Sequence, residues 1–130
     1  MTKTIIIDGA AIHDIASFYD EINRVFMVGV DWQLGPSLDA LADLLHGGFG
    51  AIDGDEPIRL IWRSMEKNRG DLGLETTRAF YRRKLERPDM FNADMIGRQL
   101  AALEAGTGPT YFDIILEIIA EHPNIRLEAG

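Results

Sequence analysis

The chain has 130 residues, a formal net charge of -8 at pH 7 and no cysteine. Such an acidic composition argues against nucleic acid as the main ligand, because phosphate backbones are bound by basic surfaces, and the lack of cysteine excludes disulfides and thiolate metal sites. The apolar N-terminal run is too short for a signal peptide or a membrane span. We therefore predict one globular domain over residues 1–130, located in the cytoplasm, with no cofactor and no metal.

Strands and helices are predicted to alternate along the chain. The β-branched run Thr2–Ile7 predicts a buried strand that ends in a turn at Asp8-Gly9. Apolar residues at helical spacing predict a first helix over about 15–26 with Asp14 as its N-cap, and the region 27–34 has no clean period and predicts a loop.

Two further strands are predicted, at 57–62 and 124–128. Between them, Ser64 is expected to cap a short helix that runs through Arg69. Thr110 and Asp113 form a capping-box pattern that opens an apolar helix over 111–121, which His122-Pro123 ends. This alternation predicts an α/β fold with a small three-stranded parallel sheet packed against helices.

A charged segment at 70–108 interrupts this order. Its two amphipathic stretches, at about 75–85 and 93–103, predict helices, and Arg87-Pro88-Asp89 separates them. The segment could form a second contact surface, a dimer interface or a cover for a sheet edge.

The stretch 35–50, GPSLDALADLLHGGFG, predicts a short helix that holds a functional surface. Leu38, Leu41 and Leu45 recur at helical spacing and predict one apolar face. Ser37 is the expected N-cap, and Gly47 with Gly48 is expected to close the helix.

Two carboxylates occupy the opposite face of this helix. Asp39 is expected at the second helical position, where its charge complements the helix dipole and accepts amide protons. Asp43 lies one turn later, toward the negative end of the helix, where like charges cost roughly 0.2–0.5 kcal/mol. Both residues could form a plain solvated face, but an unfavourable carboxylate that is kept on a short helix favours a surface shaped for a positive partner.

Acidic residues gather elsewhere as well. Asp113, Glu117 and Glu121 follow one another at four-residue spacing on the last predicted helix, opposite its apolar face. Residues 1–56 hold ten acidic residues against two basic ones. An acidic field of this kind would speed the encounter with a basic partner.

Four runs of residues resemble the barstar family of ribonuclease inhibitors and occur in the family's order. They are IIIDGAAIHDIASFYDEI at 5–22, GPSLDALADLLHGG at 35–48, IRLIWRSMEKNR at 58–69 and ILEIIAEHPNIRLE at 115–128. The most telling run is Leu-Asp-Ala-Leu followed two residues later by Asp. The resemblance implies a barstar-like fold in which 70–108 is an inserted helical segment.

The resemblance also implies a site and a partner. In the family, the loop and central helix plug the active site of a small basic microbial ribonuclease of the barnase type, where an aspartate mimics the substrate phosphate. The matching residue here is Asp43, and Asp39 matches a second contact. The other binding positions that the resemblance implies are Gln33, Gly35, Ser37, Leu38, Ala42, Gly47, Glu117 and Glu121. A member of this family is an inhibitor without catalytic residues of its own and binds neither nucleic acid nor membranes.

The chain departs from the family at aromatic positions. Gln33 stands where a tyrosine is frequent, with Trp32 one place earlier. Ala42 replaces a tryptophan of the helix, and Gly48 replaces another, with Phe49 beside it. These departures concern the identity of the ribonuclease that is bound.

Other functions remain open from the residues alone. His46, three residues after Asp43, could serve as a catalytic base, although a histidine near a helix C-terminus is more typical of dipole complementarity. Two carboxylates one turn apart are a weak signal for Mg²⁺ or Ca²⁺. An acidic module of immunity type whose partner is not a ribonuclease is a further alternative.

A basic cluster in the inserted segment could contact RNA. The acidity of the whole chain favours the other interpretation, a solvated helix face whose charges offset the acids elsewhere. The members of the cluster are Phe80, Tyr81, Arg82, Arg83, Lys84 and Arg87.

Overall fold

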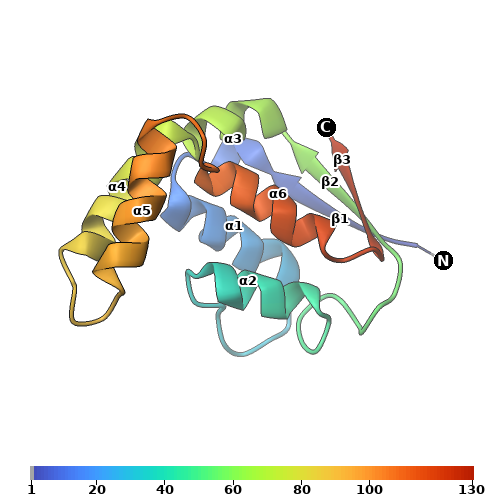
Figure 1. Ribbon diagram of the computed structural model, residues 1–130. Coiled ribbons are helices and arrows are strands. Elements are labelled where there is room, and N and C mark those ends of the chain that lie inside the picture. Colours follow the sequence, from blue (N-terminus) through green and yellow to red (C-terminus); the bar gives the residue numbers. More distant parts are fainter. Residues whose placement is uncertain (1) are drawn as a thin grey trace.

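Three parallel strands form the sheet of the computed structural model, which describes residues 2–130 (Figure 1). The strands β1 (Lys3–Asp8), β2 (Ile58–Arg63) and β3 (Ile125–Ala129) lie in the order β1-β2-β3. Their register aligns Ile5 with Leu60 and Leu60 with Leu127. The predicted α/β fold with a small parallel sheet is confirmed.

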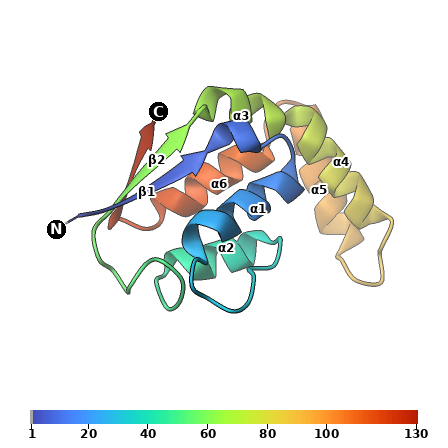
Figure 2. The same cartoon turned by 180° about the vertical axis from the view of Figure 1, so that it is seen from behind.

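One face of the sheet is covered by helices. Figures 1 and 2 show α1 (Ile15–Phe26), α2 (Leu38–Leu45) and α6 (Tyr111–Ala120) on the same side of the strands. Residues therefore alternate along β1 between buried and exposed positions. The first strand, which the sequence predicts to be buried, is buried on one face: Ile5 and Ile7 face the helices, whereas Ile6 points away from them and is 37% exposed.

The core lies between the sheet and these helices. Trp62 of β2 is fully buried and packs against Phe18 of α1 and Phe112 of α6, with ring centroids 5.9 and 5.4 Å away. Leu41 and Leu45 of α2 are buried in the same core. The binding-helix candidate is therefore anchored by its apolar face, as its spacing predicts.

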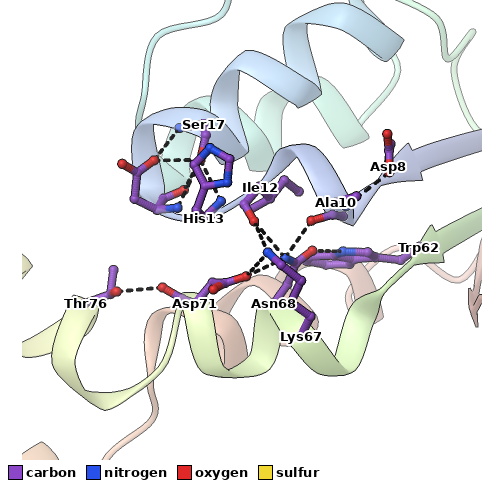
Figure 3. Close-up of polar contacts among 12 residues, drawn as sticks. Asp8, Ala10, Ile12, His13, Ser17, Trp62, Lys67, Asn68, Asp71 and Thr76 are labelled. Atoms are coloured by element: carbon purple, nitrogen blue, oxygen red, sulfur yellow. Dashed lines mark hydrogen bonds and ion pairs between the residues drawn. The ribbon is translucent and has the colours of Figure 1, made fainter.

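The short 3-10 helix η1 (Gly9–Ala11) and the helix α3 (Met65–Asp71) are joined by polar contacts (Figure 3). The side chain of Asn68 accepts a hydrogen bond from Trp62 Nε1 at 2.7 Å and donates to the carbonyls of Gly9 and Ile12 at 3.0 and 3.2 Å. This buried network fixes α3 against the end of β1.

The start of α3 differs from the prediction. Ser64 occupies the N-cap position but has a left-handed backbone with φ of 56°, and its side chain makes no capping hydrogen bond. The chain turns sharply there to pass from β2 into α3, and this geometry takes Ser64 away from the extended backbone that a capping serine needs. The helix also continues to Asp71, past the expected end at Arg69.

The segment 70–108 begins within α3 and then forms a hairpin of two helices, α4 (Leu74–Leu85) and α5 (Ala93–Glu104). A small apolar cluster around Tyr81, Ile96 and Leu103 holds the two helices together. The predicted positions of both helices are confirmed to within a residue at each end.

The hairpin is attached to the start of α6. Thr77 Oγ1 accepts a hydrogen bond from the backbone N–H of Tyr111 at 2.7 Å, and the rings of Phe80 and Tyr111 meet edge to face at 5.1 Å. Both views show the hairpin at the end of the molecule away from β3 (Figures 1 and 2).

Among residues 2–130, no helix combines the length and apolarity needed to cross a membrane.

Candidate functional site

The helix α2 is held by the residues that its sequence predicts. Ser37 Oγ accepts a hydrogen bond from the backbone N–H of Ala40 at 3.1 Å and caps the N-terminus. After the helix, Gly47 adopts a φ of +84°, which reverses the chain. A short, doubly closed helix of this kind presents its outer face in one fixed orientation.

Asp39 and Asp43 occupy that outer face. Both side chains are exposed, and neither makes an ion pair or a side-chain hydrogen bond within residues 2–130. The expectation that Asp39 accepts amide protons is wrong, because Ser37 already fills that role at the helix start. Two carboxylates are thus available to a partner.

The other implied contact positions vary in exposure. Gln33, Gly35 and Ser37 are exposed, while Leu38 and Ala42 are half-buried. Gly47 is buried and packs so closely on Gly54 that a Cβ atom at this position would lie 2.1 Å from the carbonyl oxygen of Gly54. Its contribution is therefore to the shape of the chain and not to direct contact.

The last helix supplies a second set of carboxylates beside α2. The C-terminal ends of α2 and α6 meet where the rings of His46 and His122 lie 4.8 Å apart, edge to face. Glu117 and Glu121 on α6 are exposed and have no ion-pair partner in the described part of the chain. We call the exposed carboxylates of Asp39, Asp43, Glu117 and Glu121 the acidic surface.

Asp113 does not belong to the acidic surface, although the sequence places it in the same stripe. Its carboxylate accepts a hydrogen bond from the backbone N–H of Thr110 at 3.0 Å, and Thr110 Oγ1 accepts one from the N–H of Asp113 at 3.2 Å. The predicted capping box is confirmed, and the carboxylate of Asp113 is therefore bonded to the start of its own helix.

His122 is buried, and its Nε2 atom has no hydrogen-bond partner within the described residues. Burial lowers the pKa of His122 below its usual value, the neighbouring His46 lowers it further, and Glu121 opposes both. Within residues 2–130 the backbone N–H of His46 donates to the carbonyl of Asp43 at 3.2 Å, but no hydrogen bond joins the two side chains. The two residues are therefore not arranged here as the acid–base pair that the catalytic alternative requires.

An aromatic pair lies between the two loops that flank α2. The rings of Trp32 and Phe49 are 5.0 Å apart, and Trp32 is 47% exposed. The loop that carries Trp32 is tied to α1, because Asn23 Oδ1 accepts a hydrogen bond from the N–H of Leu34 at 2.7 Å. The sequence analysis named both aromatic residues but did not predict that they touch. The one hint in the sequence is that Trp32 precedes the helix and Phe49 follows it.

A groove of about 550 Å³ runs between the start of α2 and the α4–α5 hairpin. Lys84 lies over the rings of Phe80 and Phe91, with its Nζ atom 4.4 and 5.1 Å from their centroids. Burial lowers the pKa of Lys84, and the nearby Asp39 partly offsets this effect. The lining residues are Pro36, Ser37, Leu38, Asp39, Phe80, Arg83, Lys84, Arg87, Met90 and Phe91.

Among residues 2–130, no group of three or more histidine, aspartate or glutamate side chains is placed to hold a metal ion.

Comparison with known proteins identifies the family. The model of the family described as "Barstar (barnase inhibitor)" matches residues 2–91, which is more than half of the chain, and the chain therefore belongs to the barstar family. The match includes β1, α2, β2 and α4, whereas α6 and β3 lie beyond it. No curated protein and no solved structure matches the chain. At the level of the family, membership implies a protein that inhibits a barnase-type ribonuclease.

Proposed function

We propose that this protein inhibits a small basic ribonuclease by covering the enzyme's active site with α2 and its flanking loops. The observation that carries the proposal is the state of Asp39 and Asp43, which are exposed on a rigid helix and have no partner within residues 2–130. Family membership supports the same partner class.

The inhibitory chemistry follows from the needs of the enzyme. A ribonuclease cleft gathers cationic donors around the phosphate of its substrate, and a carboxylate satisfies the same donors without offering a bond to cleave. In our proposal Asp43 takes the phosphate position and Asp39 makes a second, weaker contact. Because α2 is already closed at both ends, binding loses little conformational entropy.

Glu117 and Glu121 extend the negative field beyond α2. Their positions on the neighbouring α6 suit them to attract the basic enzyme during its approach. Gln33, Gly35, Ser37, Leu38 and Ala42 complete the proposed interface, and the turn at Gly47 sets its shape.

The pair formed by Trp32 and Phe49 compensates for the missing family aromatics. Gln33, Ala42 and Gly48 leave the binding face without large rings, whereas Trp32 offers an exposed indole beside α2. Exposed aromatic side chains are frequent anchors of protein interfaces. We place Trp32 at the edge of the ribonuclease cleft.

An inhibitor of this kind needs neither a cofactor nor catalytic residues of its own, and it acts in the cytoplasm, where a nuclease must be blocked before secretion. The test is a pull-down with small basic microbial ribonucleases, followed by titration of RNA cleavage with the purified chain. We expect activity to end at one inhibitor per enzyme. Capture of a different class of protein, with no loss of ribonuclease activity, would instead favour an acidic immunity-type module.

A further inference from the structure

The groove between α2 and the α4–α5 hairpin combines an apolar floor with a cationic rim. Leu38, Phe80 and Phe91 are half-buried, and Met90 at the hairpin tip is 61% exposed. On the rim, Arg83 has no ion-pair partner within the described residues. Such a surface favours a ligand that is both apolar and negatively charged.

The rim contrasts with the arginines elsewhere on the hairpin. Arg78 forms ion pairs with Glu75 at 2.6 Å and with Glu104 of α5 at 2.5 Å. The Nη2 atom of Arg87 contacts Met90 Sδ at 3.2 Å, and Arg87 has no ion pair within residues 2–130. Arg83 and Arg87 therefore have no acidic partner among the described residues, whereas Arg78, which joins the two helices, does.

RNA fits this groove poorly. Single-stranded nucleic acid binds by stacking bases on exposed aromatic faces along a positive track. Here the ammonium of Lys84 covers the ring faces of Phe80 and Phe91, and the carboxylate of Asp39 closes the track at α2. An acidic protein segment does not depend on base stacking, so the apolar floor with Arg83 and Arg87 can hold it on the hairpin side of the groove, while Asp39 lies on the α2 side.

The groove also adjoins the acidic surface. Asp39 belongs to both, and Ser37 and Leu38 stand beside it at the start of α2, so a protein seated on the outer face of α2 lies next to the groove. A basic patch of that protein would meet Arg83 and Arg87 as like charges, which disfavours binding.

We propose that the groove binds a peptide segment of the inhibited ribonuclease in which an apolar side chain is flanked by carboxylates. This inference rests on the proposed function for the identity of the partner. It divides the interface into two parts of opposite charge: the acidic surface engages the cationic active site, and the hairpin engages an acidic segment beside it. The hairpin would thereby select among ribonucleases that share the same active site.

The test uses the full chain labelled with ¹³C at its methionine methyl groups. Met90 reports on the groove, while Met27 and Met65 lie outside it. The probes are the capped peptide Asp-Leu-Phe-Glu-Asp, its lysine counterpart Lys-Leu-Phe-Lys-Lys and a hexauridylate RNA. We expect the acidic peptide alone, at millimolar concentration, to shift the Met90 signal.

Variants separate this inference from the proposed function. Arg83→Glu combined with Arg87→Glu should weaken binding of the acidic peptide at least about tenfold, whereas the matched control Arg98→Glu on α5, outside the groove, should change it less than about twofold. Asp43→Ala should retain peptide binding while it loses ribonuclease inhibition.

The outcomes are distinct. A Met90 shift with RNA or with the lysine peptide equal to that with the acidic one, or no shift with the acidic peptide, would overturn the inference. In either case the titration of ribonuclease activity still decides the proposed function on its own. Conversely, a chain that binds the acidic peptide but inhibits no ribonuclease would support the preference of the groove for acidic peptides and would contradict the proposal that the peptide belongs to a ribonuclease.

Discussion

The buried side chain of Asn68 connects three separate parts of the chain. Its Oδ1 atom accepts from the indole of Trp62, and its Nδ2 atom donates to the carbonyls of Gly9 and Ile12 and to Asp71 (Figure 3). A single amide thus satisfies a core tryptophan, the turn after β1 and the end of α3. Buried groups of this kind are costly when they lose their partners.

Replacing Asn68 by leucine should therefore destabilise the protein strongly. The change leaves the buried indole N–H of Trp62 without its partner. The carbonyls of Gly9 and Ile12 each lose one hydrogen bond but keep another, from the backbone N–H of Ile12 and from Lys67. We expect the free energy of unfolding to fall by about 1–3 kcal/mol. Urea unfolding measures this quantity. Gln99→Leu, at an exposed position of α5, is the control and should change it by less than about 0.5 kcal/mol. Equal values for the two variants would contradict the role given to Asn68.

His122 should make the protein less stable in mild acid. Because burial lowers its pKa in the folded state, the unfolded chain takes up a proton first as the pH falls below the ordinary value of 6.5. Stability is then lost progressively until the pH reaches the folded-state pKa. Urea unfolding at pH 7.5 and 5.5 measures this slope, and His122→Gln should flatten it. An unchanged slope in the variant would show that His122 is not its source.

At the scale of secondary structure, local signals predicted most elements. The caps Asp14, Ser37 and Thr110 all lie at the predicted helix starts, because their side chains bond to amides only three residues away. Ser64 failed as a cap because its backbone is set by the passage from β2 to α3, which is not a local property.

The position of the inserted hairpin could not be predicted from the sequence. Its two helices have clear periodicity, but their place beside α2 depends on the contact of Thr77 with Tyr111, which is 34 residues away along the chain. The groove therefore had no sequence signal beyond its basic cluster. The exposed carboxylates Asp39 and Asp43, by contrast, followed from helix spacing alone.

The glycines after α2 offer a matched test of how this helix is closed. Gly47→Ala combines a φ of +84° with a Cβ atom 2.1 Å from the carbonyl oxygen of Gly54, and should cost at least about 2 kcal/mol of stability. Gly48→Ala meets no atom within 4 Å and should cost less than about 0.5 kcal/mol. Thermal unfolding compares the two variants. A neutral Gly47→Ala would show that the turn relaxes and that α2 is less rigidly held.

At the scale of the whole molecule, charge of both signs is divided among regions. The acidic surface lies on α2 and the C-terminal part of α6, and Arg83 and Arg87, which have no ion pair within residues 2–130, lie on the hairpin, while the net charge is -8. The net charge governs the long-range attraction to a basic enzyme. The positions of the individual acidic and basic side chains govern how well the two surfaces fit once they meet.

Added salt should consequently slow the association of the complex much more than it changes its dissociation. The screening length falls from about 10 Å at 0.1 M salt to about 3 Å at 1 M, so the association rate with the inhibited ribonuclease should drop steeply while the dissociation rate changes little. Stopped-flow mixing over this range of salt measures both rates. A dissociation rate that carries most of the salt effect would contradict steering by the acidic surface.

The central claim is that Asp43 enters the cationic cleft of the ribonuclease. The most direct test is the dissociation constant of the complex for Asp43→Ala beside the charge-matched control Asp94→Ala, which lies on α5. Truncation of one member of a buried charge pair costs about 2–5 kcal/mol, a range for which barnase and barstar are themselves the reference case, so Asp43→Ala should weaken binding at least about thirtyfold. Asp39→Ala and Glu117→Ala should have smaller effects, and Asp94→Ala almost none. Equal effects of Asp43→Ala and Asp94→Ala would contradict the account.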